Sequence, residues 1–401
     1  MAVLQGKKVV LGITGCIAAY KAVELVRLLV KQGCKVDVVM TSSAQEFIAP
    51  LTLQTLSGNP VVTELFELYQ EREIGHISLA ERAELLVIAP ATANTIGKIA
   101  GGIADDMLST VAMATRAPIL IAPAMNVNMW NNPVVQRNIE TLQERGCFFV
   151  DPGQGDLACG AQGVGRLADV GDIVEGIIGA LSSDDFAGVK VLVTAGPTRE
   201  PLDPVRFISN PSSGKMGYAL ARAFKRRGAA VTLISGPVAL PPPPGVAFVP
   251  VVTVDEMARA VQNQFEAVDV VVKSAAVGDY RPAAVAPQKI KKTGGQMTVQ
   301  LEKTEDILAG LGSKKADKIL VGFAAETEDI LVHGKEKLRA KNLDMIVIND
   351  VSRTDIGFNA DANEVTVVLS DGSDRRLPYM SKEAVADKLL DIIVELRSSV
   401  S

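Results

Sequence analysis

The residues between positions 193 and 217 combine types that bind anions. They follow a β-branched apolar segment, residues 189–194, that is typical of a buried strand. A loop rich in proline leads to Ser-Ser-Gly-Lys-Met-Gly at 212–217, where an apolar helical period begins. A strand, a loop and a helix N-terminus in this order direct backbone N–H groups at a bound anion. The stretch matches neither a P-loop nor a dinucleotide fingerprint, and an ordinary helix cap is the alternative.

A second glycine-rich turn, Gly-Ile-Thr-Gly-Cys at 12–16, follows the strand-like residues 7–11. Apolar residues at Ala22, Leu25, Val26 and Leu29 then have helical spacing. A glycine-rich first turn in a strand–helix–strand unit is the usual place for a phosphate-bearing cofactor. This signal is weak alone, because many nucleotide-binding folds share it.

Few residues suit covalent or metal chemistry. Cys16, Cys34, Cys147 and Cys159 contain no C-x-x-C pair, and only two histidines accompany them, so disulfides and a zinc site are not expected. Cys34 and Cys147 each follow a glycine and open a strand, as small buried residues do. Cys159 lies among five glycines between 153 and 165, a composition that suits a hinged lid.

Strand-like and helix-like segments alternate along the chain, which predicts two doubly wound parallel sheets in an α/β fold. The polar segment 181–188 separates the two series. In the first, we expect strands at 7–11, 36–40, 85–89, 119–122 and 147–150, with helices at 93–114, 134–145 and 170–181. In the second, we expect strands at 189–194, 231–235, 268–273, 319–323 and 345–348, an antiparallel hairpin at 364–377 and a closing helix at 382–396.

The composition limits the function classes. A chain of 401 residues exceeds the usual size of one core, so two domains are expected. The hydrophobic share is 48% and the aromatic share 4%, which suits parallel sheets built from Val, Ile, Leu and Ala. A net charge of −5 without a basic stripe argues against nucleic-acid binding. No signal or membrane-spanning pattern is evident, so we expect a cytoplasmic protein without a membrane partner.

Further motifs are Met-Thr-Ser-Ser-Ala at 40–44, Ala-Pro-Ala-Thr-Ala-Asn-Thr at 89–95, Pro-Ala-Met-Asn at 123–126 and Ser-Ala-Ala-Val-Gly-Asp-Tyr at 274–280. Together with residues 193–217, they closely resemble the bacterial bifunctional flavoproteins of coenzyme A biosynthesis. The resemblance covers essentially the whole chain. It implies a flavodoxin-like, FMN-dependent phosphopantothenoylcysteine decarboxylase domain at 1–185. It also implies a CTP-dependent phosphopantothenate–cysteine ligase domain at 186–401, with an added antiparallel hairpin.

In the first half, the resemblance implies three catalytic residues. His76 matches the family's histidine beside the flavin, and Asn126 matches the residue that binds the carboxylate to be lost. Cys159 matches the proton donor on a flap that covers the substrate. An amide at 126 suits its role, because it adds no counter-charge that would oppose loss of CO₂. The implied flavin-binding residues are Gly12, Thr14, Gly15, Ser43, Thr92, Asn94, Ser109 and Thr110.

The implied decarboxylation needs the cofactor because the cysteine carboxylate has no electron sink. Oxidation of the substrate thiol by FMN gives a thioaldehyde, which accepts the electrons that CO₂ leaves behind. Cys159 protonates the resulting enethiolate, and the same flavin returns the two electrons. The reaction is redox-neutral and requires no nicotinamide.

In the second half, Asn210 matches a family residue that contacts the activated acyl group, and Lys289 matches one that contacts phosphate. Lys291 and Lys292 read as a solvated edge. The family usually has Asn-Pro before Asp306 where this chain has Thr304-Glu305, so the resemblance implies backbone contacts there rather than side-chain contacts. The implied CTP-binding residues are Lys273, Ser274, Ala275, Asp279, Lys289, Glu305, Asp306, Ile307, Leu308, Phe323, Lys337 and Lys341.

The implied ligation joins 4′-phosphopantothenate to cysteine. The carboxylate attacks CTP to give an acyl-cytidylate and pyrophosphate, and the amine of cysteine then displaces CMP. Mg²⁺ is expected, held mainly by CTP phosphates and water, with no protein ligand identified. The resemblance also implies a homo-oligomer, with dimers of the ligase domain and a higher-order assembly of the flavin domain.

Two other classes of protein remain open. One is a flavin-binding regulatory protein without chemistry, which loss of His76, Asn126 or Cys159 would favour; all three are present. The other is a nicotinamide oxidoreductase built from two dinucleotide-binding units. The chain lacks both glycine fingerprints of that class, and a flavin spectrum without a response to NAD(P)H would exclude it.

Overall fold

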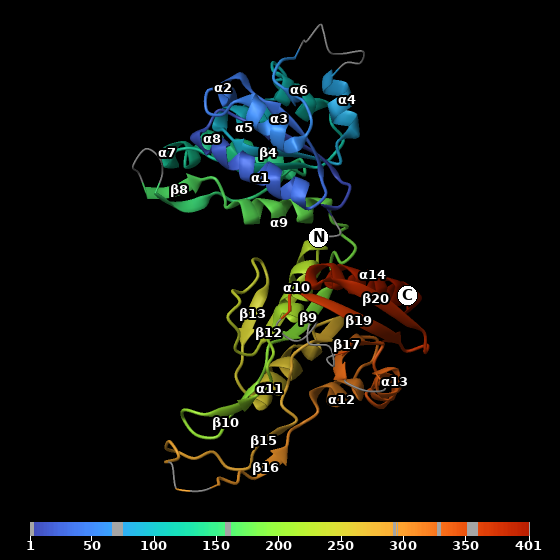
Figure 1. Cartoon of the computed structure of the whole chain (residues 1–401). Helices are drawn as coiled ribbons and strands as arrows, with labels where there is room; N and C mark the ends of the chain where they lie inside the picture. Colours follow the sequence, from blue (N-terminus) through green and yellow to red (C-terminus); the bar gives the residue numbers. More distant parts are fainter. Residues whose placement is uncertain are drawn as a thin grey trace. The chain divides into compact units, whose positions relative to one another are not determined.

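The computed structural model describes residues 4–65, 75–156, 162–291, 294, 296–326, 330–350 and 360–400. The chain divides into two compact units, Met1–Ser182 and Ser183–Ser401, each with its own sheet (Figure 1). Across these described ranges, no helix has both the length and the apolar character that a membrane span needs.

The first unit is built on a six-stranded parallel sheet of order β3-β2-β1-β4-β5-β6. The order reverses between β1 and β4, so the loops after these strands leave in opposite directions, and doubly wound folds bind their ligands at such a switch point. The strands are β1 (Lys8–Ile13), β2 (Lys35–Met40), β3 (Val61–Val62), β4 (Leu85–Ala91), β5 (Ile119–Pro123) and β6 (Phe148–Phe149).

Helices cover both faces of this sheet. Val9 and Leu11 of β1 face the core beneath α1 and α9, whereas Val10 faces the core beneath α5, α6 and α8. This burial on both faces explains why the strands read as continuous apolar runs. The helical segments are η2 (Ile17–Ala19), α1 (Tyr20–Lys31), α2 (Ser42–Gln45), α3 (Pro50–Ser57), α4 (Gly75–Arg82), α5 (Ala93–Gly101), α6 (Met107–Ala114), α7 (Val127–Trp130), α8 (Pro133–Glu144) and α9 (Val170–Leu181).

The single helix expected over 93–114 is wrong. Gly102 adopts a left-handed φ of 72° and closes α5. Asp106 then starts α6 with a capping box, in which its side chain accepts from the Ser109 N–H and Ser109 Oγ accepts from the Asp106 N–H. The apolar period continues through both helices, which hid the break from a reading of periodicity alone.

The second unit carries an eight-stranded sheet of order β13-β12-β9-β14-β17-β18-β19-β20. The strands from β13 to β18 are parallel, and the predicted hairpin of β19 and β20 adds to the edge in antiparallel orientation. The doubly wound α/β fold of both halves is therefore confirmed. The strands are β9 (Lys190–Ala195), β12 (Ala230–Ser235), β13 (Ala247–Pro250), β14 (Val270–Lys273), β17 (Ile319–Glu326), β18 (Met345–Asp350), β19 (Ala362–Leu369) and β20 (Asp374–Ser381).

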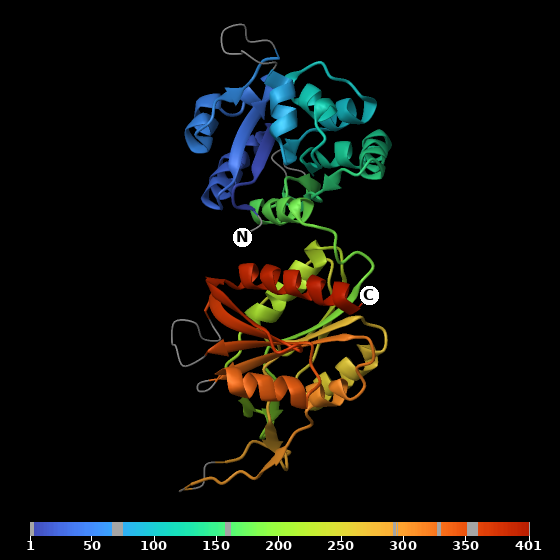
Figure 2. The ribbon, with the colours of Figure 1, turned by 90° about the vertical axis from the view of Figure 1, so that its right-hand side faces the viewer.

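Figure 2 shows α10 and α14 on one side of this sheet and α11 and α13 on the other. Val191 and Val193 of β9 pack into the core beneath α10 and α14, and Leu192 packs into the opposite core. Ion pairs from Arg222 to Glu383 and from Arg226 to Asp387 align α10 and α14 in parallel. The helices are α10 (Lys215–Arg226), α11 (Val254–Phe265), α12 (Ile307–Gly312), α13 (Ile330–Ala340) and α14 (Lys382–Val400).

Three small antiparallel ribbons were not predicted from the sequence. In the first unit, β7 (Gly153–Asp156) pairs with β8 (Gln162–Arg166). In the second unit, β10 (Arg199–Pro201) pairs with β11 (Phe207–Ser209), and β15 (Tyr280–Pro282) pairs with β16 (Leu301–Lys303). All three belong to the loops that surround the carboxyl edges of the two sheets.

Candidate functional site

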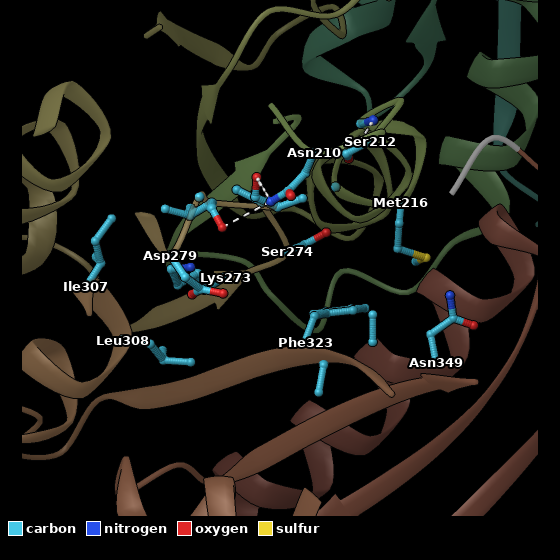
Figure 3. A pocket seen from close by; sticks show the side chains of 18 of the residues that line it. Asn210, Ser212, Met216, Lys273, Ser274, Asp279, Ile307, Leu308, Phe323 and Asn349 are labelled. Carbon is cyan, nitrogen blue, oxygen red and sulfur yellow. Dashed lines mark hydrogen bonds between the residues drawn. The ribbon is translucent and has the colours of Figure 1, made fainter. Parts of the chain in front are cut away.

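A pocket of about 500 Å³ opens at the carboxyl ends of β14, β17 and β18 in the second unit. Its walls come from segments far apart in the sequence, including residues 210–217, 273–279 and 303–308 (Figure 3). In Figure 3, Ile307 and Leu308 lie at one end and Met216 and Asn349 at the other. The pocket is thus an elongated site along the sheet edge, where doubly wound folds bind their ligands.

The structure brings together all but one of the residues implied to bind CTP or the acyl group. They come from the end of β14 and the loop after it, the residues before and at the start of α12, β17, α13 and the residue that follows it, and the segment before α10. The pocket residues in this set are Asn210, Lys273, Ser274, Ala275, Asp279, Glu305, Asp306, Ile307, Leu308, Phe323, Lys337 and Lys341.

Lys289 is the exception, because it does not line the pocket and its side chain is exposed. The residue that follows it, Ile290, is hydrogen-bonded to residues that do not line the pocket. Its N–H donates to Asp203 (3.1 Å), and Arg206 Nη2 donates to its carbonyl (2.9 Å). The Arg206 guanidinium also holds the pKa of Asp203 well below its usual range. Lys289 therefore lies beside an anchored ion pair, outside the pocket.

The N-terminus of α10 packs closely against the end of β9. Gly214 precedes the helix with a left-handed φ of 76°, which favours glycine. A Cβ added at Gly217 would lie 2.6 Å from the Cβ of Ala195 and 3.0 Å from the Thr194 carbonyl. Glycine at 217 thus lets the first turn of α10 approach the strand edge, where its N–H groups can serve the pocket.

Asn210 joins two walls of the pocket. Its Nδ2 donates to the carbonyl oxygens of Ala276 (3.1 Å) and Val277 (3.2 Å) in the loop after β14. The amide therefore fixes the segment before α10 against the strand edge. A carboxylate in its place could not donate these two hydrogen bonds.

Opposite charges meet among the residues that line the pocket. Lys341 Nζ lies 2.8 Å from Asp306 Oδ2, while Asp306 also caps α12 through the Ala309 N–H. Burial would raise the pKa of Asp306, but these two contacts lower it. Burial lowers the pKa of Lys273 to about 8, and the Lys341 charge adds to this effect. These cations suit a bound polyphosphate, which would supply the missing negative charge.

Several pocket residues were not singled out as ligand-binding in the sequence. They are Asn349 at the end of β18, Asn363 at the start of β19 and Lys382 at the start of α14, whereas Lys215 and Met216 at the start of α10 belong to the stretch that was expected to bind an anion. Asn363 and Lys382 read as ordinary strand and helix residues. Only the pairing of β18 with β19 brings them to the strand edge.

In the first unit, the implied flavin-binding residues lie at the end of β1, in the loops after β1 and β4, and in the first turns of α2, α5 and α6. Thr14 after β1 is buried and links two loops: its Oγ1 donates to the Pro90 carbonyl (2.7 Å) and accepts from the Thr92 N–H (3.0 Å). A Cβ added at Gly15 would lie 2.4 Å from the Cβ of Ser43, so the loops after β1 and β2 also touch.

Among the remaining predicted flavin-binding residues, the hydroxyls of Ser109 and Thr110 form hydrogen bonds within α6 and its cap. Ser109 is buried within the capping box of α6, and Thr110 Oγ1 donates to the Asp106 carbonyl (2.7 Å). Gly12 packs against Leu108, because an added Cβ would lie 2.3 Å from Leu108 Cδ1. Ser43 and Asn94 are exposed and offer polar side chains after β2 and β4.

The predicted catalytic residues of the first unit are placed in part. His76 lies in the first turn of α4, and Asn126 precedes α7 and accepts a hydrogen bond from the Asn128 N–H (2.8 Å). Cys159 lies outside the described residues, in the connection between β7 and β8.

The β7–β8 ribbon rests on the Asn126 segment through glycines. The Met125 N–H donates to the Gly165 carbonyl (2.9 Å), and a Cβ at Gly165 would lie 2.3 Å from the Met125 carbonyl oxygen. A Cβ at Gly163 would lie 2.7 Å from Val127 Cγ2. The ribbon that carries the connection to Cys159 is therefore packed directly against the segment of Asn126.

We expect Gly165→Ala to lower the melting temperature of the first unit by several degrees. The substitution adds a steric clash to a φ of +142°, which favours glycine, and such strain costs about 1–3 kcal/mol. Gly153→Ala in β7 is the matched control, because its nearest neighbour would be 3.8 Å away. Equal melting temperatures for the two variants, measured by calorimetry, would contradict this packing.

Comparison with known proteins identifies the family. The model of the family described as Flavoprotein matches residues 2–182, and that of the DNA/pantothenate metabolism flavoprotein C-terminal domain matches residues 186–396. The chain is 50% identical over 397 residues to the coenzyme A biosynthesis bifunctional protein CoaBC of Bacillus subtilis (strain 168), covering 98% of both chains. It is 47% identical over 396 residues to CoaBC of Escherichia coli (strain K12), covering 98% of this chain and 97% of that protein.

Among solved structures, the C-terminal domain of a coenzyme A biosynthesis bifunctional protein CoaBC shares 43% identity with this chain. It covers 54% of this chain and 100% of its own, with a TM-score of 0.47. The two family models and the full-length relatives give the same result. The chain belongs to the family of bifunctional coenzyme A biosynthesis enzymes, with a flavoprotein domain followed by a pantothenate-metabolism domain.

Proposed function

We propose that this chain carries out two consecutive reactions. The unit 183–401 ligates 4′-phosphopantothenate to cysteine with CTP, and the unit 1–182 decarboxylates the product to 4′-phosphopantetheine with FMN. The observation that best supports the proposal is the pocket of the second unit. It gathers residues from distant segments to which the family resemblance implies a shared nucleotide site.

For the ligase, the proposal assigns the cytosine to the residues 305–308 and the triphosphate to the cations Lys273, Lys337 and Lys341. The carboxylate of 4′-phosphopantothenate attacks the α-phosphorus, which forms a C–O–P bond and releases pyrophosphate. Asn210 orients the acyl-cytidylate beside the loop after β14. The cysteine amine then attacks the acyl carbon, CMP leaves, and one proton is released.

Mg²⁺ belongs to the proposed ligase site as the counter-ion of the triphosphate. The donor set fits a hard cation, because the carboxylates Asp279 and Asp306 line the same pocket as the lysines. We assign the metal mainly to CTP phosphates and water, with these carboxylates nearby.

FMN is the proposed cofactor of the first unit. The fit rests on the loops after β1, β2 and β4, which touch one another and carry Ser43, Thr92 and Asn94 at the sheet edge. When bound, the flavin accepts two electrons from the substrate thiol and returns them after CO₂ has left. In the proposal, Asn126 holds the departing carboxylate, His76 lies beside the cofactor and Cys159 supplies the proton to the substrate carbon.

The proposed partners are the three substrates and other copies of the chain. Exposed apolar side chains such as Tyr20 and Leu51 in the first unit offer surface for self-association. The proposed assemblies are dimers of the ligase unit and a larger assembly of the flavin unit.

The fragment 183–401 provides the test of the domain assignment. It forms its own compact unit, so we expect it to fold alone and to ligate cysteine with CTP in the absence of flavin. Ligation is measured by release of pyrophosphate and CMP. A folded fragment that needs FMN or the first unit for CTP turnover would contradict the assignment.

Lys289 receives a separate prediction, because its role rests on the sequence pattern alone. If it stabilises charge on the α-phosphoryl group, Lys289→Gln should slow pyrophosphate release by roughly 10²–10³-fold and leave decarboxylation unchanged. Lys291→Gln is the matched control, since Lys291 is an exposed lysine of the same run. Pyrophosphate release at equal rates in both variants would place Lys289 with the solvated lysines.

A further inference from the structure

One end of the ligase pocket carries polar residues to which the proposed reaction gives no role. We call it the Lys382 end, formed by Lys215, Asn349, Asn363 and Lys382. Figure 3 shows Asn349 opposite the end that holds Ile307 and Leu308. Lys215 and Lys382 are the first residues of α10 and α14. Asn349 lies near the end of β18 and Asn363 near the start of β19, so four elements meet at this end of the pocket.

Two amides at this end each have a buried oxygen with unmet hydrogen-bonding capacity. Asn363 is only 5% exposed, and within the described ranges neither its Oδ1 nor that of Asn349 has a hydrogen-bond partner. A buried polar atom without a partner is costly, so native structures normally match it with protein, water or ligand. The oxygen and nitrogen of an amide can exchange places, so either atom can meet a ligand. Both side chains line the pocket, where a bound ligand could supply the missing hydrogen bonds.

Positive charge accompanies these amides. Lys382 is only 6% exposed, and its Nζ lies 2.5 Å from the Ala360 carbonyl. Burial and the nearby charge of Lys215 lower the pKa of Lys382 to about 8, although Asp361 opposes the shift. Lys215 pairs with Asp361 (2.6 Å), whose own side chain is 91% exposed. A buried ammonium with a lowered pKa marks a place where an anion would be stabilised.

Two helix N-termini reinforce this charge. Lys215 is the first residue of α10, which has 12 residues, and Lys382 is the first residue of α14, which has 19. The two helices run in parallel. Both helix dipoles therefore present their positive ends toward the same region of the pocket. Glu383 in the first turn of α14 is engaged with Arg222 and Arg226, on the side toward α10.

We infer that the Lys382 end is a phosphoryl subsite in which Lys382 and Asn363 bind a phosphoryl group of a ligase substrate. The inference deepens the proposed function and rests on it. Two substrates could supply the group: CTP through its β- and γ-phosphates, which leave as pyrophosphate, or the acyl substrate through its 4′-phosphate. Both are dianionic or more at neutral pH, so both match two helix N-termini, a buried lysine and amide donors.

The test compares four variants of the full-length protein. Lys382→Gln removes the charge, and Asn363→Ser replaces the buried amide with a shorter hydroxyl. Lys388→Gln on the exposed side of α14 is the matched control. Calorimetry measures the binding of inorganic pyrophosphate and of CMP to each protein. Steady-state kinetics measure the KM for 4′-phosphopantothenate. Lys382→Arg, which keeps the charge, checks whether binding is rescued.

If the phosphoryl group comes from CTP, Lys382→Gln should weaken pyrophosphate binding by about tenfold or more and leave CMP binding unchanged. If it comes from the acyl substrate, the KM for 4′-phosphopantothenate should rise by a similar factor while pyrophosphate binding stays constant. Either result supports the subsite. Affinities and KM equal to those of Lys388→Gln would overturn it. Failure of the wild-type protein to turn over CTP would instead overturn the proposed function, because pyrophosphate binding is measured without turnover.

Discussion

Cys159→Ser should leave FMN bound and still allow CO₂ to leave, but should slow formation of the saturated product by ~10²–10⁴-fold, the usual contribution of a positioned proton donor. A serine hydroxyl is a far weaker acid than a thiol, so the unsaturated enethiolate would not be protonated efficiently. The substrate would then remain at the oxidised level after CO₂ is lost. Mass spectrometry of the products, with the flavin spectrum recorded in parallel, measures this outcome.

Cys147→Ser is the matched control for this prediction. Burial raises the pKa of the Cys147 thiol, which directly precedes β6 and is only half-buried. We expect Cys147→Ser to keep decarboxylation near the wild-type rate. The proton-donor role would be wrong if Cys159→Ser also turned over at that rate and no oxidised intermediate accumulated.

Asn210→Asp should let the acyl-cytidylate accumulate. The Nδ2 of Asn210 donates to the Ala276 and Val277 carbonyl oxygens, and a carboxylate would place an oxygen against both of them. Repulsion should displace the segment that presents the acyl carbon to cysteine. Loss of one preorganised donor costs roughly 10²–10³-fold in kcat. We therefore expect pyrophosphate release to continue for one turnover with cysteine withheld, and the slow step to follow when cysteine is added.

Asn263→Asp provides the charge-matched control, because Asn263 is exposed on α11 and does not line the pocket. It adds the same negative charge to the second unit without touching the loop after β14. Rapid-quench analysis of the acyl-cytidylate separates the two variants. Equal rates of CMP release would show that the contacts of Asn210 do not control the second step.

Much of the fold could be predicted because the sheets are buried on both faces. Segments such as 189–194 and 231–235 read as apolar strands, and β9 and β12 lie within one residue of them. The three short ribbons could not be predicted, because strands of three to five residues give no usable period. The break between α5 and α6 was missed because Gly102 and Asp106 interrupt the backbone but not the apolar pattern.

Site residues could be predicted from the sequence where they belong to one continuous motif. Residues that only the strand topology brings to the pocket could not. The segment 273–279 was identified by its sequence, and the structure places it in the pocket. Asn363 and Lys382 gave no signal, since they join the pocket only because β19 runs antiparallel to β18 and leads through β20 into α14. Lys289 shows the opposite case, a residue with a clear motif that the structure keeps at the surface.

The most direct test of the account is the stoichiometry of the full reaction. The full-length, FMN-loaded protein is incubated anaerobically with 4′-phosphopantothenate, cysteine, CTP and Mg²⁺, without any nicotinamide. We predict equal amounts of pyrophosphate, CMP, CO₂ and 4′-phosphopantetheine, with the flavin oxidised at the end. Release of CO₂ without CTP, or a requirement for NAD(P)H, would contradict the coupling of a CTP-driven ligation to a redox-neutral decarboxylation.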